Sequence, residues 1–171
     1  MRHLLFLLLA LGSAAQAAPT TMPIPGQNWQ ISFDAPVLNK MKEQSRPGQF
    51  VYVGNAGKFN LSLHVEDPGC SGGTTHRAYY ECFWPKASRN PMIAQETVVA
   101  TEGPRYYKVA FDIHAPWQGR ILVLKNLNYL IAYRGKWIDL HVSVVDPQAD
   151  DLAMLEALEK SLVYEETPAP K

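Results

Sequence analysis

Two segments of the chain carry residues suited to acid–base chemistry at every second position. These residues are Ser62, His64 and Glu66 in one segment and Asp139, His141 and Ser143 in the other. Residues two apart on a β-strand lie roughly 6.5 Å apart on the same side of the sheet. If the two segments are neighbouring strands, their polar residues converge on one face, which allows the hypothesis of a hydrolase that uses Asp139 and His141.

A polar sheet face with ordinary cross-strand pairs explains the same pattern. Backbone geometry alone does not bring Asp139 into hydrogen-bond contact with His141, so side-chain reach would have to close the gap. Serine hydrolysis also needs a nucleophile on a strained turn and an oxyanion hole, whereas Ser62 and Ser143 are expected in the middle of strands. We therefore predict no catalytic residue.

Metal binding would draw on the same residues, but the spacing of the histidines does not support it. After the first 17 residues the histidines are His64, His76, His114 and His141, without a His-x-x-x-His or His-Glu-x-x-His pattern. A zinc site needs three or four ligands that are themselves held in place by neighbours. The sequence predicts neither a metal nor an organic cofactor.

The first 17 residues are predicted to be a signal peptide. Arg2 supplies the positive start, residues 4–11 form a short apolar run, and Ala15 and Ala17 are small residues where signal peptidase reads the chain. The run is shorter than the roughly 20 apolar residues of a membrane span, and no cysteine near the cleavage position offers a lipid attachment point. We expect a soluble periplasmic or secreted protein, cleaved after Ala17 and without a membrane span.

Cys70 and Cys82 remain after that cleavage, and two cysteines of one domain usually pair in an oxidising compartment. Their spacing excludes a Cys-x-x-Cys redox pair, and a metal site would need more ligands close by. We predict a disulfide that closes the loop containing Gly72 and Gly73.

Aromatic residues gather beside that loop and in one other place. They are Tyr79, Tyr80, Phe83 and Trp84 beside the loop, and Trp117 in a second loop that looks exposed. Such rings on rigid loops are used in contacts with proteins and glycans. Alternatively, they cover an open edge or end of a sheet core. These five residues are the candidate partner-binding residues.

The composition indicates a globular protein that does not bind nucleic acid. The chain has 171 residues, of which 47% are hydrophobic and 19% are charged, as in a globular protein with a sizeable core. Its formal net charge is zero, so the basic stripe of nucleic-acid-binding proteins is missing and we expect no nucleic-acid partner.

Period-two alternation dominates the body of the chain. Strands are predicted at 29–33, 49–53, 59–66, 94–101, 106–113, 128–133 and 137–145. A stripe of leucines from Leu152 to Leu162 predicts a closing helix, a second helix is predicted over 37–44, and a short helical turn before Pro85. Residues 18–28 are expected to be an extended lead-in without regular structure, 29–164 a single domain, and 165–171 a flexible tail.

Strands with one apolar face need a cover on that face, and the leucine-striped helix supplies it. The predicted fold class is therefore α+β, an antiparallel β-sheet with one or two helices packed on one face.

The order of these segments resembles the PsbP-like fold, whose bacterial members include small periplasmic proteins of the DcrB type. The resemblance rests on the segments Trp29–Phe33 and Trp137–Ser143 and on the closing helix with Glu159–Leu162, and it spans about Trp29 to Tyr164. Unlike DcrB-type lipoproteins the chain has no lipobox cysteine, and the Cys70 to Cys82 insert has no counterpart that we can place in that family. The resemblance implies a topology and transfers no functional residue.

Together these features favour a non-catalytic binding or accessory protein. Its predicted partner is a protein or a cell-envelope component, bound through the aromatic residues of the disulfide loop. The alternatives are the hydrolase that uses Asp139 and His141, and an immunity-type protein that blocks a toxin in the periplasm.

Overall fold

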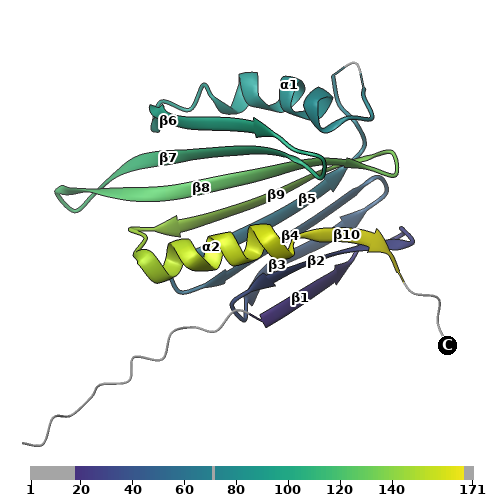
Figure 1. Ribbon diagram of the computed structural model, residues 1–171, viewed down its shortest axis with the longest axis horizontal. Coiled ribbons are helices and arrows are strands. Elements are labelled where there is room, and N and C mark those ends of the chain that lie inside the picture. Colours follow the sequence, from purple (N-terminus) through teal and green to yellow (C-terminus); the bar gives the residue numbers. More distant parts are fainter. Residues whose placement is uncertain (1–17, 71, 168–171) are drawn as a thin grey trace, which may run out of the picture.

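The computed structural model describes residues 18–70 and 72–167. Segments in which apolar and polar residues alternate form the strands of two antiparallel sheets (Figure 1). The larger sheet contains, in spatial order, β3 (Asn39–Arg46), β4 (Gln49–Ala56), β5 (Phe59–Glu66), β9 (Lys136–Val145), β8 (Arg120–Tyr133), β7 (Tyr107–Trp117) and β6 (Ile93–Glu102). The smaller sheet contains β1 (Ala18–Pro23), β2 (Trp29–Ala35) and β10 (Val163–Glu166), with β2 in the middle. The helices are α1 (His76–Ala87) and α2 (Ala149–Ser161). The predicted signal peptide, residues 1–17, lies outside the described residues.

One face of the large sheet forms the main core. Leu63 on β5 and Leu140 on β9 are paired and fully buried there, because the small sheet and α2 cover this face. The small sheet contributes Trp29, and α2 contributes Leu158, which are also fully buried. The predicted closing helix is confirmed, and its first turn contains both expected acidic residues.

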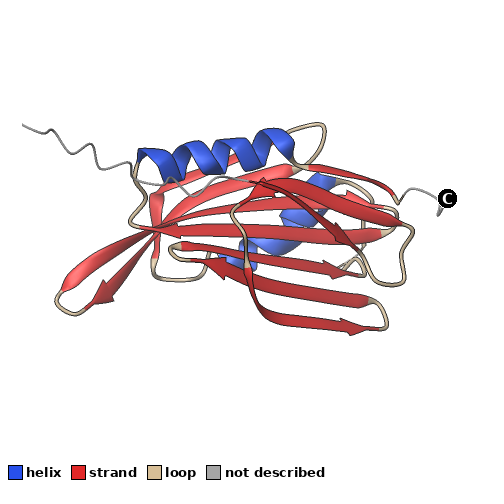
Figure 2. Ribbon diagram, turned by 90° about the horizontal axis from the view of Figure 1, so that it is seen from below, coloured by secondary structure: helices blue, strands red, loops and turns tan. Residues whose placement is uncertain are grey.

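The opposite face of the large sheet is covered by α1 (Figure 2). This helix begins where the Thr75 side chain accepts a hydrogen bond of 3.1 Å from the backbone N–H of Ala78. Its buried Tyr79 packs with Val109 of β7 and Leu130 of β8, so the helix lies over the β7 and β8 side of the sheet. The α+β class, an antiparallel sheet with helices packed on it, is confirmed, and the two helices take opposite faces.

The helix predicted over 37–44 is wrong, because this segment forms most of the edge strand β3. Leu38 and Met41 have a helix-like spacing, but the Met41 side chain is 66% exposed and most of the strand faces solvent. An outer strand rich in charged residues protects a sheet edge from pairing with another chain. Because nearly every residue of β3 is exposed, its sequence lacks the alternation of apolar and polar residues by which a strand is predicted.

The two ends of the described chain are also more regular than expected. Residues 18–23 form β1 rather than an irregular lead-in, and Pro19 and Pro23 are tolerated because β1 is an edge strand. Glu165 and Glu166 belong to β10 rather than to a flexible tail, whose last four residues lie outside the described part. The helical turn expected before Pro85 is a helix of 12 residues that continues past this proline. Neither described helix is long and apolar enough to cross a membrane.

Candidate functional site

A groove runs beside α1, because the helix covers only part of its face of the large sheet. We call it the α1 groove, and it consists of two adjoining hollows that share Phe83 and Ala87 of α1. The polar hollow, of about 340 Å³, has a floor of Ser62, His64, Asn126, Asn128, Asp139 and His141. Its walls include Phe111 and Ile93. The apolar hollow, of about 480 Å³, lies between Tyr79, Trp137 and the two cysteines, with Glu66 and Lys86 also lining it.

Strand register brings the predicted polar residues together. The strands β5 and β9 are direct neighbours, with Ser62 opposite His141 and His64 opposite Asp139. The convergence expected from the sequence is therefore found in the structure. Glu66 pairs with Trp137 further along the same strands and so belongs to the apolar hollow.

Two asparagines of β8 that the sequence analysis missed complete the floor. Asn128 donates from Nδ2 to both carboxyl oxygens of Asp139, at 2.9 and 3.1 Å. Asn126 Oδ1 lies 3.0 Å from His141 Nε2, and Asn126 Nδ2 donates to the backbone carbonyl of Leu124 at 2.7 Å. Both asparagines and Asp139 are buried. These two asparagines could have been found from the sequence, because Asn126-Leu127-Asn128 alternates polar and apolar residues in the same way as the neighbouring strand.

Burial changes the titration of this floor. The pKa of Asp139 is raised to about 7, mainly by burial, against the opposing hydrogen bond from Asn128 and with a further increase from Glu66. The pKa of His141 is lowered to about 4, mainly by burial and secondarily by His64. The pKa of His64 is itself lowered, with burial as the largest cause. Just below neutral pH the floor therefore carries a largely protonated acid and neutral histidines.

These hydrogen bonds do not assemble a catalytic unit. Asp139 and His141 each bond to an asparagine rather than to one another. Within the described residues no hydrogen bond joins His64 or His141 to a serine, as a nucleophile and its base would require. The described residues also contain no group of three or more side chains that could hold a metal ion.

One serine lies in a sequence pattern that hydrolases use. Residues 69–73 read Gly-Cys-Ser-Gly-Gly, which fits the Gly-x-Ser-x-Gly pattern of a nucleophile elbow. That elbow is a sharp turn directly between a strand and a helix, whereas here β5 ends at Glu66 and α1 begins at His76. The serine, residue 71, lies outside the described residues.

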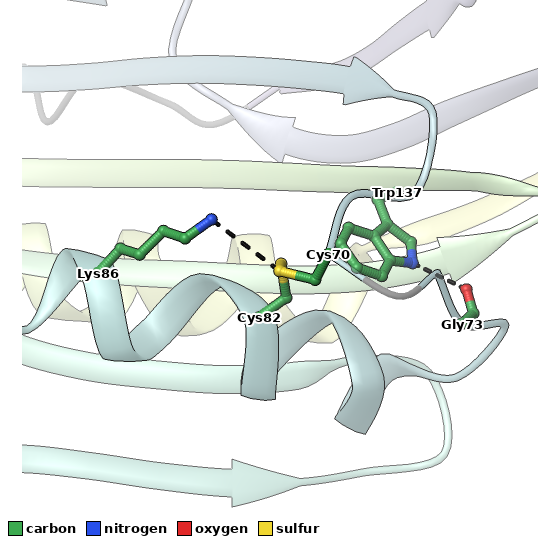
Figure 3. Close-up of a disulfide and its surroundings, with 5 residues drawn as sticks. All are labelled: Cys70, Gly73, Cys82, Lys86 and Trp137. Atoms are coloured by element: carbon green, nitrogen blue, oxygen red, sulfur yellow. Dashed lines mark hydrogen bonds between the residues drawn. A yellow bond between two sulfur atoms is a disulfide. The ribbon is translucent and has the colours of Figure 1, made fainter.

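The predicted disulfide between Cys70 and Cys82 is confirmed, with the two Cα atoms 6.1 Å apart. It ties the loop before α1 to the helix, and Lys86 Nζ lies 3.9 Å from Cys70 Sγ (Figure 3). The Trp137 indole N–H donates to the Gly73 carbonyl at 3.0 Å, which fixes the other side of the loop. Gly73 has a φ of 150°, and a Cβ there would meet the Ala78 Cβ at 2.5 Å, so the loop needs glycine at this point.

Most of the candidate aromatic residues hold α1 on the sheet. Tyr79 stacks on Trp137 with ring centroids 4.6 Å apart, and Tyr80 stacks on Tyr107 at 4.0 Å. The ring centroids of Trp84 and of Phe111 on β7 lie 5.5 Å apart, and Phe83 lines both hollows. These four rings thus pack between α1 and a face of the sheet. Trp117 differs, because it is 54% exposed at the tip of the β7–β8 hairpin, which extends beyond the sheet at the left of Figure 1.

Comparison with known proteins finds a likeness in structure but none in sequence. No family model matches the chain, and no curated protein matches it in sequence. A solved structure from Bacteroides thetaiotaomicron VPI-5482 matches at a TM-score of 0.45 and 10% identity over 80% of this chain, which spans only 45% of that structure.

Two further solved structures match along nearly their whole length. LpqN, involved in cell envelope biogenesis of Mycobacterium tuberculosis, has a TM-score of 0.50 and 11% identity, over 89% of this chain and 92% of LpqN. The Ran-binding protein Mog1p of Saccharomyces cerevisiae has a TM-score of 0.50 and 9% identity, over 86% of this chain and 95% of Mog1p. At such identities the likeness concerns the fold alone: the chain shares with both an antiparallel sheet that carries helices, consistent with a PsbP-like fold.

Proposed function

We propose that this chain is an exported, non-catalytic binding protein of the cell envelope, and that the α1 groove is its ligand site. One observation carries the proposal: a buried, hydrogen-bonded polar floor lies beneath an open hollow instead of beneath a packed helix. Burying polar groups costs stability unless they are paired, and local departures from good packing are expected at functional sites. A floor of Asn126, Asn128 and Asp139 is such a departure in an otherwise apolar sheet interior.

The floor is also suitably rigid. It belongs to β5, β9 and β8, which lie at the centre of the larger sheet, and the opposite sides of these strands pack into the main core. Because Asn126 and Asn128 are held by hydrogen bonds, a ligand would meet donors and acceptors that are already oriented.

The proposed location follows from three features. Residues 1–17 have the pattern of a cleaved signal peptide, and the disulfide suits an oxidising compartment. LpqN, which shares the fold, takes part in envelope biogenesis. We therefore propose a PsbP-like periplasmic or secreted protein, related in fold to the DcrB type but without its lipid anchor. Its first mature residue is Ala18, and residues 29–164 form one domain together with the strand residues before and after them that pair with β2.

A groove-filling variant tests the proposal. Ala87 lines both hollows, so Ala87→Phe should fill the space between α1 and the floor. Glu81→Phe on the same helix is the matched control, because residue 81 is exposed and lines neither hollow. The full chain would be expressed with its own amino-terminal segment, purified, and mixed with the small-molecule fraction of an envelope extract. Native mass spectrometry would then detect bound molecules.

The expected result is a bound mass that Glu81→Phe retains and Ala87→Phe loses. Equal binding by both variants would place the ligand elsewhere, and no binding by the unaltered protein would contradict a small-molecule site. Amino-terminal sequencing of the purified protein tests the export part separately: a start at Ala18 supports it, and a start at Met1 contradicts it.

A further inference from the structure

Asp139 is a buried acid that has no cationic partner among the described residues. Its side chain faces the polar hollow, is 8% exposed, and takes part in none of the ion pairs of the described residues. The described lining of that hollow includes no lysine or arginine. Removing a carboxylate from water is unfavourable unless a positive charge or several hydrogen bonds compensate it. Here Asn128 alone donates to it.

The other groups around Asp139 do not supply a positive charge. From β5 it is faced by His64 and, further along, by the acidic Glu66. From β9 its neighbour is His141, and from α1 the phenol of Tyr79 lies close enough for Asp139 to affect its pKa. Burial lowers the pKa of both histidines, so they are neutral at neutral pH.

Lys86, the one lysine in the described lining of the α1 groove, belongs to the other hollow. Lys86 lines the apolar hollow, and its Nζ lies 3.9 Å from Cys70 Sγ, as Figure 3 shows. Among residues 18–70 and 72–167, the acid of the polar hollow thus has no ion-pair partner, and the ammonium group of Lys86 lies beside the disulfide instead.

Charge and shape together indicate the class of ligand. In the polar hollow an anion would meet Asp139, and the described lining has no basic residue to balance that charge. A cation would supply the missing charge, and the rings of Phe83 and Phe111 on the walls attract cations through their faces. Ile93 and Ile113 offer apolar contacts for an alkyl chain, and about 340 Å³ suits a small molecule.

Resting on the proposed function of the α1 groove, we propose that the polar hollow binds a small organic cation. Its alkylammonium group pairs with Asp139 near the rings of Phe83 and Phe111, and its alkyl part lies against Ile93 and Ile113. Binding favours the ionised carboxylate, so the acid releases its proton to solvent when the cation enters at a pH where it is protonated.

The test is a titration with n-butylammonium chloride, followed through the side-chain amide NMR signals of Asn126 and Asn128. Neutral n-butanol is the matched probe without charge. Tetramethylammonium, a cation that donates no hydrogen bond, tells whether charge alone suffices. We expect saturable binding of butylammonium, at least tenfold weaker or no binding of butanol, and about tenfold tighter butylammonium binding at pH 8 than at pH 6, because the pKa of Asp139 is about 7.

Two variants complete the design. Asp139→Asn keeps the shape and removes the charge, so it should weaken butylammonium binding at least tenfold and abolish the pH dependence. Lys160→Met should leave the affinity unchanged within about twofold, because this lysine belongs to α2 on the opposite face of the sheet and lines neither hollow. The pH dependence of the unaltered protein keeps the test decisive if Asp139→Asn does not fold.

The proposal is overturned if butylammonium does not saturate, if butanol binds equally well, or if affinity is the same at both pH values. If butylammonium does not bind but Ala87→Phe still abolishes binding of a molecule from the extract, the groove is a site for a ligand of another chemical class. Failure of both experiments would remove the ligand site itself.

Discussion

The two faces of the large sheet use the same strands for opposite purposes. Leu63 and Leu140 pair on the α2 face, and one position along each strand His64 and Asp139 pair on the α1 face. The first pair is fully buried under the small sheet and α2, whereas the second borders an open hollow. Since side chains of a strand alternate between faces, one register fixes both the core and the polar floor. We infer that the α2 face supplies most of the stability and the α1 face supplies the site.

The largest expected effect is on the α2 face. Leu140→Ala removes a fully buried side chain from a central strand and should lower the free energy of unfolding by about 2–5 kcal/mol, through lost burial and the cavity left behind. Urea denaturation of the variant and the unaltered protein measures the difference. A loss below about 1 kcal/mol would mean that the α2 face is not the main source of stability.

The disulfide of the α1 face comes next. Replacing both Cys70 and Cys82 by serine should lower stability by about 2–4 kcal/mol, because the cross-link restricts the unfolded chain. The fold should survive, since the α2 face does not depend on this bond. Far-ultraviolet circular dichroism and denaturation check both points, and loss of the sheet signal would contradict the division between the faces. Thiol titration of the unreduced native protein should find no free thiol from this pair.

Asp139 should make the stability of the protein depend on pH in a defined direction. Its folded pKa of about 7 lies above the ordinary value of 3.8, so its stabilising contribution is complete below about pH 4 and is lost as the pH rises through 7. Asp139→Asn cannot ionise and should gain about 4 kcal/mol relative to the unaltered protein between pH 4 and pH 8. Denaturation at several pH values measures this gain. A constant difference across that range would contradict it.

Titration of His141 should change the stability with pH in the direction opposite to Asp139, which allows a second measurement in the Asp139→Asn variant. Its folded pKa of about 4 lies below the ordinary 6.5, so its contribution is present above pH 6.5 and is lost as the pH falls through 4. In the Asp139→Asn background, stability should therefore rise with pH between 4 and 6.5. Adding His141→Gln should remove that rise.

The smallest effect is expected at the tip of the β7–β8 hairpin. Trp117 is 54% exposed and lies away from both cores, so Trp117→Ser should change stability by less than about 0.5 kcal/mol. Tyr79→Ala is the contrasting variant from the same set of candidate residues. Its buried ring is stacked on Trp137, so we expect a loss of about 3 kcal/mol or more. Thermal unfolding of the pair distinguishes a surface ring from a core ring.

The sequence predicted those elements that have one buried and one polar side. Alternation in β5 and β9 identified both strands and the residues of their shared polar face, and the leucine stripe identified α2. The edge strand β3 was mistaken for a helix because almost every residue is exposed, so burial imposed no period on the sequence. The strand β1 was missed because Pro19 and Pro23 are usual in loops and are allowed only on a sheet edge.

The site was only partly predictable for a different reason. Sequence spacing placed Asp139 and His141 on one face, but their burial depends on how α1 docks over distant strands. Likewise, the aromatic cluster was visible, yet its stacking on Trp137 and Tyr107 follows from the position of the helix on the sheet. Local patterns do not contain that long-range packing.

The central position of β2 in the small sheet has a consequence for the order of folding. One edge of β2 pairs with β1 and the other with β10, which come from opposite ends of the described chain. A chain that emerges from its amino terminus can pair β1 with β2 early, but the second edge must wait until the last strand has been made. During that interval the unpaired edge is open to a strand of another molecule. We infer that pairing of β10 with β2 closes this edge against self-association, and Tyr164 of β10 also packs against the main core.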